Sequence, residues 1–76
     1  MEKVKIDTEY IKLDQFLKWS GAVMSGIEAK VMVQNGEVKV NGEVENQRGK
    51  KLRSGDTVEF NGILYEVCWI LEVTLW

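Results

Sequence analysis

One stretch, residues 25–42, constrains the fold more than any other part of this sequence, because helix, stop, strand and turn signals follow one another in it without a linker. Ser25 and Glu28 have the spacing of a capping box. In that motif the hydroxyl accepts a hydrogen bond from a first-turn amide, and the carboxylate reaches back to the amide of Ser25. Gly36 offers the positive φ at which helices commonly end. We therefore predict a helix from Ser25 to about Asn35.

A tight hairpin is predicted directly after this helix. Val38 and Val40 alternate with charged residues, which is typical of a half-buried strand. The dipeptide Asn41-Gly42 suits a two-residue hairpin turn, and residues 43–45 continue the alternation as the returning strand.

Similar alternation predicts three more strands. At the start of the chain, residues 2–6 place Val4 and Ile6 on one face, and we expect this strand at a sheet edge. Residues 57–60 and 63–67 flank a second Asn-Gly dipeptide and should pair with each other. The segment between the first strand and residue 12 is interpreted as a turn.

A first helix is predicted from residue 12 to about Gly21, because Leu13, Phe16 and Leu17 recur at helical spacing. Neither helix is long enough to be stable alone, so we expect their apolar faces to pack on each other. The expected partners on the second helix are Val31, Met32 and Val33, and Phe16 and Phe60 are expected in the core. The predicted fold class is α+β, with two short packed helices on a small, mainly antiparallel β-sheet.

The length of 76 residues allows one domain with a modest core, which we place over residues 1–76, with 68–76 as an apolar C-terminal extension. The chain has one cysteine, Cys68, and no histidine. These counts argue against a disulfide framework, a zinc site and imidazole chemistry, and they fit a reducing, cytoplasmic setting. No apolar run is long enough to cross a bilayer, and no cofactor or metal is expected.

Charge is segregated along the chain. The net charge is −2, yet residues 46–54 carry four cations and no acid. Leu52 is the apolar residue of this basic loop and is expected to anchor it to the core. The loop is either a solvated turn or a surface for a polyanion, and composition alone leaves both interpretations open.

Two aromatic or apolar features also have alternative interpretations. The segment from Cys68 to Trp76 is nearly uncharged, which fits either a buried final strand or a homodimer edge. The residues expected at such an edge are Trp69, Ile70, Leu71 and Val73. Trp19 either packs beside the first helix or stacks on a base, and packing is favoured.

An ordered set of motifs resembles a known family. Lys12-Leu13-Asp14-Gln15-Phe16-Leu17 is followed by Ser25 with Ala29, then by Gly36-x-Val38-x-Val40-Asn41-Gly42 and by Gly55-Asp56-x-Val58. In order and spacing this set resembles the RNA-binding domain named after ribosomal small-subunit protein four, over about residues 3–67. Within that superfamily it looks most like the stand-alone bacterial YaaA-like and YbcJ-like proteins.

This resemblance implies a fold, the alpha-L RNA-binding motif, and a cationic face that recognises structured RNA. It assigns the family's first-helix cation to Lys12 and its strand-side cation to Lys39. Many members have an arginine after the helix-capping serine, whereas this chain has Gly26. The remaining RNA-binding residues would then be the cations of the second helix and of the basic loop: Lys30, Arg48, Lys50, Lys51 and Arg53.

The function expected from these observations is non-catalytic binding of structured RNA, such as ribosomal or transfer RNA. Most of this expectation comes from the resemblance. The alternative is a protein-interaction module that is dimeric through its apolar C-terminal strand and contacts an acidic partner with its basic loop. An enzyme is not expected, because Glu28 is explained by the helix cap and Asp14 by the exposed face of the first helix.

Overall fold

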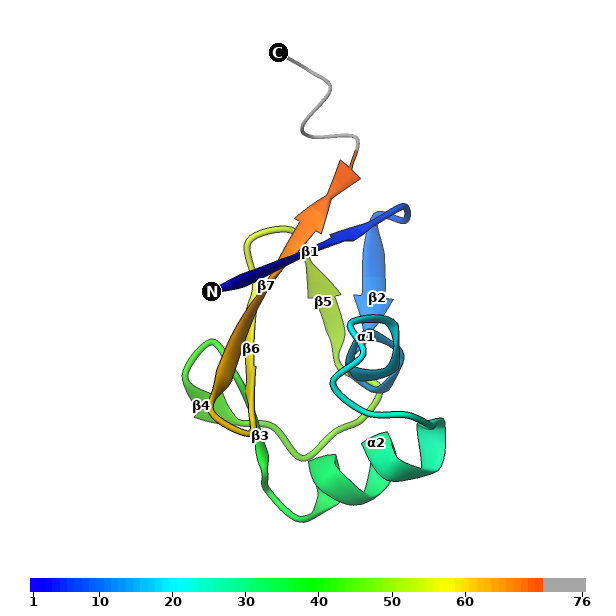
Figure 1. Ribbon diagram of the computed structural model, residues 1–76, viewed down its shortest axis with the longest axis vertical. Coiled ribbons are helices and arrows are strands. Elements are labelled where there is room, and N and C mark those ends of the chain that lie inside the picture. Colours follow the sequence, from blue (N-terminus) through cyan, green and yellow to red (C-terminus); the bar gives the residue numbers. More distant parts are fainter. Residues whose placement is uncertain (71–76) are drawn as a thin grey trace.

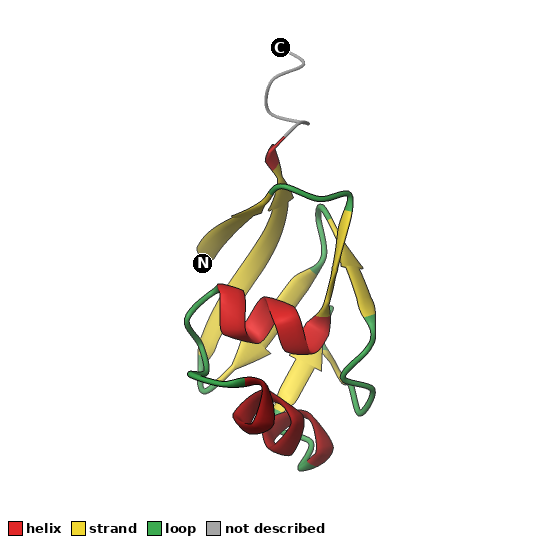
Figure 2. Ribbon diagram, turned by 90° about the vertical axis from the view of Figure 1, so that its right-hand side faces the viewer, coloured by secondary structure: helices red, strands yellow, loops and turns green. Residues whose placement is uncertain are grey.

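The computed structural model describes residues 1–70, which form two helices and seven strands. In chain order these are β1 (Glu2–Ile6), β2 (Tyr10–Lys12), α1 (Leu13–Trp19), α2 (Gly26–Gln34), β3 (Val38–Val40), β4 (Glu43–Val44), β5 (Lys51–Arg53), β6 (Thr57–Phe60) and β7 (Ile63–Trp69). Strands β1, β7, β6, β3 and β4 form one sheet in that order, and β2 pairs with β5 in a second, two-stranded sheet (Figure 1). One helix crosses in front of the strands and the other lies at their lower end (Figure 2).

The predicted α+β class is confirmed. Four of the strand pairs, β2–β5, β3–β4, β3–β6 and β6–β7, are antiparallel. The β1–β7 pair is parallel, and it places Val4 opposite Val67. The first strand is an edge strand, as expected, with Ile6 buried and Val4 half-buried against the core.

The helices pack on each other, and of the three α2 residues expected in this contact Val33 is buried, Met32 packs half-buried against the core, and Val31 is exposed. On α1 the residues Leu13, Phe16 and Leu17 are buried as expected. On α2 the buried residues are Ala29 and Val33, one helical turn apart, while Val31 is 42% exposed. The prediction for Val31 is therefore wrong. Residues four apart share a face of a helix, so a helix that buries Ala29 and Val33 turns Val31 outward.

Both ends of α2 follow the sequence signals, with one change at its start. The Ser25 hydroxyl accepts a hydrogen bond from the amide of Glu28 at 3.1 Å. The Glu28 carboxylate accepts from the amide of Met24 at 2.8 Å, so the predicted bond to the amide of Ser25 is replaced by one to the preceding residue. Gly36 has a φ of 75°, as expected for the residue that ends the helix.

The two Asn-Gly dipeptides form tight hairpin turns. Asn41 and Gly42 have φ values of 51° and 86°, and Asn61 and Gly62 have 55° and 78°. Two consecutive positive φ angles are the signature of the type I′ turn, whose twist matches that of paired strands. The first turn is also tied to the neighbouring strand, because the Asn41 side-chain oxygen accepts from the amide of Thr57 at 2.9 Å.

The core lies between the helices and the inner faces of both sheets. The ring of Phe16 meets that of Tyr65 edge to face, with centroids 6.2 Å apart and planes at 85°. Leu52 is fully buried and anchors the basic loop, as predicted. Phe60 packs against the core but remains half-buried.

The end of the described chain continues the sheet. Cys68 and Trp69 belong to β7 and lie opposite Lys5 and Ile6 of β1. Of the residues expected at a dimer edge, Leu71 and Val73 lie outside the described residues. Within residues 1–70, no helix is long and apolar enough to span a membrane.

Replacing Leu52 by alanine is expected to lower the free energy of unfolding by about 2–5 kcal/mol, because it leaves a cavity under the basic loop. Equilibrium urea denaturation measures this change. Ile27→Ala is the control: Ile27 is 78% exposed on α2, so its truncation should change the free energy of unfolding by less than about 0.5 kcal/mol. Equal, small effects of both substitutions would show that Leu52 does not anchor the loop.

Gly36→Ala is expected to destabilise the fold by about 1–2 kcal/mol, because a side chain is strained at positive φ. Space is not the obstacle, since an added Cβ would meet Val44 at an ordinary 3.7 Å. Gly26→Ala is the matched control, because Gly26 lies in the first turn of α2 without a positive φ and with open space around it. It should stabilise the protein by up to about 1 kcal/mol. Thermal unfolding of the two variants compares these opposite signs, and a stabilising Gly36→Ala would refute the assignment.

Candidate nucleic-acid interface

The two-stranded sheet of β2 and β5 sorts its side chains onto two faces. Its register pairs Tyr10 with Arg53, Ile11 with Leu52, and Lys12 with Lys51. Residues directly opposite each other in an antiparallel pair point to the same face, and neighbours along a strand point to opposite faces. The central pair is turned to the core, with Leu52 buried and Ile11 half-buried. The outer face therefore carries the exposed side chains of Tyr10, Lys12, Lys51 and Arg53, here called the cationic ribbon.

The remaining part of the basic loop is held beside this ribbon by the start of α1. The first amides of a helix have no partner within the helix and need acceptors elsewhere. Here the amide of Leu13 donates to the carbonyl of Lys50 at 2.8 Å, and the amide of Asp14 donates to the carbonyl of Arg48 at 3.0 Å. The backbone of the loop is thereby fixed next to Lys12, although loop and helix are far apart in the sequence.

Tyr10 lies among the cations of the ribbon. The Lys51 ammonium nitrogen is 4.8 Å from the centroid of the Tyr10 ring, and the central guanidinium carbon of Arg53 is 5.6 Å from it. Cations within about 6 Å of an aromatic face are attracted by the electron density of the ring. The ring thus orients two cations side by side on an exposed surface.

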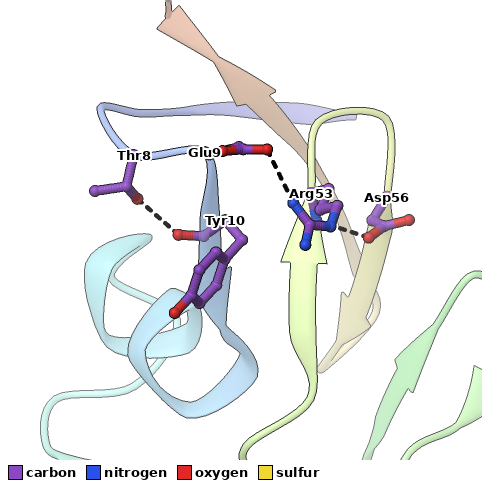
Figure 3. Close-up of polar contacts among 5 residues, drawn as sticks. All are labelled: Thr8, Glu9, Tyr10, Arg53 and Asp56. Carbon is purple, nitrogen blue, oxygen red and sulfur yellow. Dashed lines mark hydrogen bonds and ion pairs between the residues drawn. The ribbon is translucent and has the colours of Figure 1, made fainter.

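Arg53 has two acidic neighbours, which Figure 3 shows. One terminal nitrogen of its guanidinium is 3.5 Å from a carboxylate oxygen of Glu9, and its backbone amide donates to Asp56 at 2.8 Å. The Arg53 and Glu9 side chains are 57% and 71% exposed. An exposed ion pair of this length contributes little stability. The guanidinium can therefore exchange Glu9 for an external anion at small cost.

The structure brings five of the predicted site residues together. They are Lys12, which directly precedes α1, and the four cations of the basic loop, Arg48, Lys50, Lys51 and Arg53. Lys30 and Lys39 come from other elements, α2 and β3, and Lys39 lies opposite Glu59 of β6. In Figure 1 these two elements lie below β2 and β5. For all seven of these residues, a role in binding RNA remains a prediction.

Sequence reasoning missed the contribution of Tyr10. The segment around it was interpreted as a turn, whereas residues 10–12 form β2. The signal was the alternation of Tyr10, Ile11 and Lys12, which has the period of a strand but is too short to be recognised without its partner.

Trp19, for which packing was favoured over stacking, has features of both. Its indole nitrogen donates to the carbonyl of Lys5 at 2.9 Å, which fixes the ring against β1. Trp19 is nevertheless 60% exposed, so part of its surface remains open to solvent.

Metal binding finds no support in the part of the chain that the structure describes. No group of three or more histidine, cysteine, aspartate or glutamate residues there is arranged to hold an ion.

The family model of the S4 domain matches residues 4–68. RlbA of Bacillus subtilis (strain 168), named a probable ribosome maturation protein, is 49% identical over 59 residues, which cover 78% of this chain and 83% of RlbA. YbcJ of Escherichia coli (strain K12) is 40% identical over 53 residues, which cover 70% of this chain and 76% of YbcJ.

Two solved structures share the fold. The solution structure of Escherichia coli YbcJ, described as revealing an αL motif involved in RNA binding, has a TM-score of 0.68 at 33% identity and covers 90% of this chain and 87% of YbcJ. The crystal structure of the 30S ribosomal protein S4e from Thermoplasma acidophilum has a TM-score of 0.59 at 25% identity, and the match covers 78% of this chain and 31% of S4e. The motifs, the helix pair on its sheet and the family model agree, and this chain belongs to the S4 domain family.

Proposed function

We propose that this protein binds structured RNA without catalysing a reaction, and that the cationic ribbon and the adjoining loop hold the RNA phosphates. The observation that carries the proposal is the ribbon itself, in which β2 and β5 place Lys12, Lys51 and Arg53 on one exposed face. The names of the relatives support it, since RlbA is named for ribosome maturation and the YbcJ structure is described by an RNA-binding motif. Ribosomal RNA in the cytoplasm is therefore the proposed target.

The arrangement of charges in the ribbon favours an anionic ligand. Lys12 and Lys51 occupy directly opposite positions, and like charges at such positions destabilise a strand pair. A phosphate placed between them would remove this repulsion. Arg53 offers a planar fork that can bind a phosphate through two hydrogen bonds, whereas the lysines act as mobile point charges.

The ribbon suits recognition of RNA shape. Double-stranded RNA is recognised mostly through its phosphates and hydroxyls, because its major groove is too deep and narrow for side chains. Cations fixed on a paired strand and on a loop tied to a helix match a fixed spacing of phosphates better than cations on a free tail. Arg48 and Lys50 extend the proposed surface along the loop.

The carboxylates that could suggest catalysis have structural partners. Glu28 accepts a hydrogen bond from the amide of Met24, and Asp14 accepts one from the amide of Gln15 at 2.8 Å. The chain has no histidine to serve as an acid or base at neutral pH. These features support binding rather than turnover as the proposed role.

The proposal is tested by titrating the protein with a structured fragment of ribosomal RNA and with a single-stranded control of the same length. If three or four cations meet phosphates, the logarithm of the binding constant should fall against the logarithm of salt concentration with a slope of about −2 to −4. The structured fragment should bind more tightly than the single strand. No binding at low salt, where phosphate contacts are strongest, would refute RNA binding and favour the alternative of a dimeric protein-interaction module.

The double variant Lys51→Gln with Arg53→Gln is expected to flatten this slope by about one to two units, because two phosphate contacts are lost. The free energy of unfolding should change by less than about 1 kcal/mol, since both side chains are exposed. The matched control, Lys3→Gln with Lys18→Gln, removes the same charge from exposed positions on β1 and α1 outside the ribbon. A control that flattens the slope equally would show that net charge, not the ribbon, determines binding.

A further inference from the structure

An open groove of about 530 Å³ adjoins the cationic ribbon. It lies where the turn after β1, the strand β2 and the helix α1 meet, and its lining includes Asp7, Tyr10, Lys12, Gln15 and Trp19. Tyr10 and Lys12 also belong to the ribbon, so the groove and the ribbon form one continuous surface.

Trp19 forms a fixed aromatic wall of this groove. Its hydrogen bond to the carbonyl of Lys5 satisfies the one polar group of the indole and sets the orientation of the ring. The residue is still 60% exposed, which is a large apolar surface to leave in water. A ring that is already oriented loses little conformational freedom when a flat ligand stacks on it.

Tyr10 contributes a second aromatic side chain to the groove, and a hydrogen bond from Thr8 fixes the turn before it. The hydroxyl of Thr8 donates to the carbonyl of Tyr10 at 2.7 Å, which closes the turn that leads into β2 (Figure 3). The cations over the Tyr10 ring, Lys51 and Arg53, bring positive charge to the edge of the groove. Aromatic surface beside fixed cations is the combination with which proteins hold unpaired nucleotides.

We propose that this groove receives a single unpaired base of an RNA whose phosphates lie on the cationic ribbon. This inference rests on the proposed function and adds to it a feature of the RNA, a bulged or looped-out nucleotide. Its base would stack on Trp19, while Lys12 contacts the adjoining phosphate. Gln15 and Asp7 supply an amide and a carboxylate, which can form hydrogen bonds with the edge of a base.

Size and charge both favour a nucleotide as the occupant. Sites of about 300–1,000 Å³ are typical of small-molecule ligands, so the groove has room for one base and its sugar but not for a duplex. Lys12 at the groove and the neighbouring Lys51 and Arg53 complement a ligand that carries phosphate on one side and a flat ring on the other.

Two blunt RNA duplexes that differ by a single bulged adenine test the proposal by equilibrium binding. The protein should bind the bulged duplex about fivefold or more tightly, as expected for one stacked base. Trp19→Leu should abolish this preference and leave affinity for the fully paired duplex within about twofold. Val44→Thr is the control, because Val44 is exposed on β4, outside both groove and ribbon, and it should leave the preference unchanged.

A second measurement does not depend on a variant that folds. When 2-aminopurine replaces the bulged adenine, saturation with the unaltered protein should quench its fluorescence, because stacking on an indole quenches it.

Trp19→Phe keeps an aromatic ring without the hydrogen bond to Lys5. This variant should retain most of the preference for the bulged duplex.

The outcomes separate this inference from the proposed function. Equal affinity for the two duplexes, or unquenched 2-aminopurine at saturation, overturns the base site even if ribosomal RNA binds with the expected salt dependence. A Trp19→Leu variant that weakens both duplexes equally assigns Trp19 a structural role and also overturns the base site. If the protein binds none of the three RNAs, neither of the two duplexes nor the ribosomal fragment, both the base site and the proposed function are overturned.

Discussion

The burial of Leu52 opposite Ile11 is the contact on which the candidate interface depends. It joins a strand at the start of the chain to a strand in the basic loop, and hydrophobic burial drives that pairing. Because side chains alternate along a strand, turning this apolar pair inward turns the flanking cations outward. The same contact sets the loop beside α1, whose free amides then bind the loop carbonyls. The buried contact of Ile11 and Leu52 thus holds the cations of the ribbon close together despite their mutual repulsion.

The elements that the sequence predicted well are those whose signals are local. Ser25 caps α2, Gly36 ends it at positive φ, and Asn41-Gly42 forms a type I′ turn, and each of these depends on backbone geometry within a few residues. The apolar face of α1 was also predicted, because Leu13, Phe16 and Leu17 leave a single choice of buried face. On α2 apolar residues lie on more than one side. The choice of Val33 over Val31 therefore required the position of α1.

The candidate interface was only partly predictable, because it is assembled by contacts between distant segments. The cations of the loop and Lys12 could be named from the sequence and the family resemblance, but their meeting on one face follows from the β2–β5 pairing. Tyr10 under Lys51 and Arg53, and Arg53 beside Glu9, are consequences of the same register. Three-residue strands carry too little periodic signal to be recognised without their partner. The strands β1 and β7 were expected, but their parallel pairing was not foreseen, because alternation within a strand does not specify a partner from the other end of the chain.

The two edges of the five-stranded sheet, β1 and β4, have a consequence for how copies of the protein meet in solution. An open edge offers free amides and carbonyls to a strand from another molecule, which is a route to aggregation. Strand β4 has only two residues, and one of them is the acidic Glu43. On β1, Lys3 and Lys5 are exposed, and the indole of Trp19 already occupies the carbonyl of Lys5. The short length and the acidic residue of β4 therefore disfavour pairing with a strand of another molecule. On β1, the exposed lysines and the Trp19 hydrogen bond have the same effect.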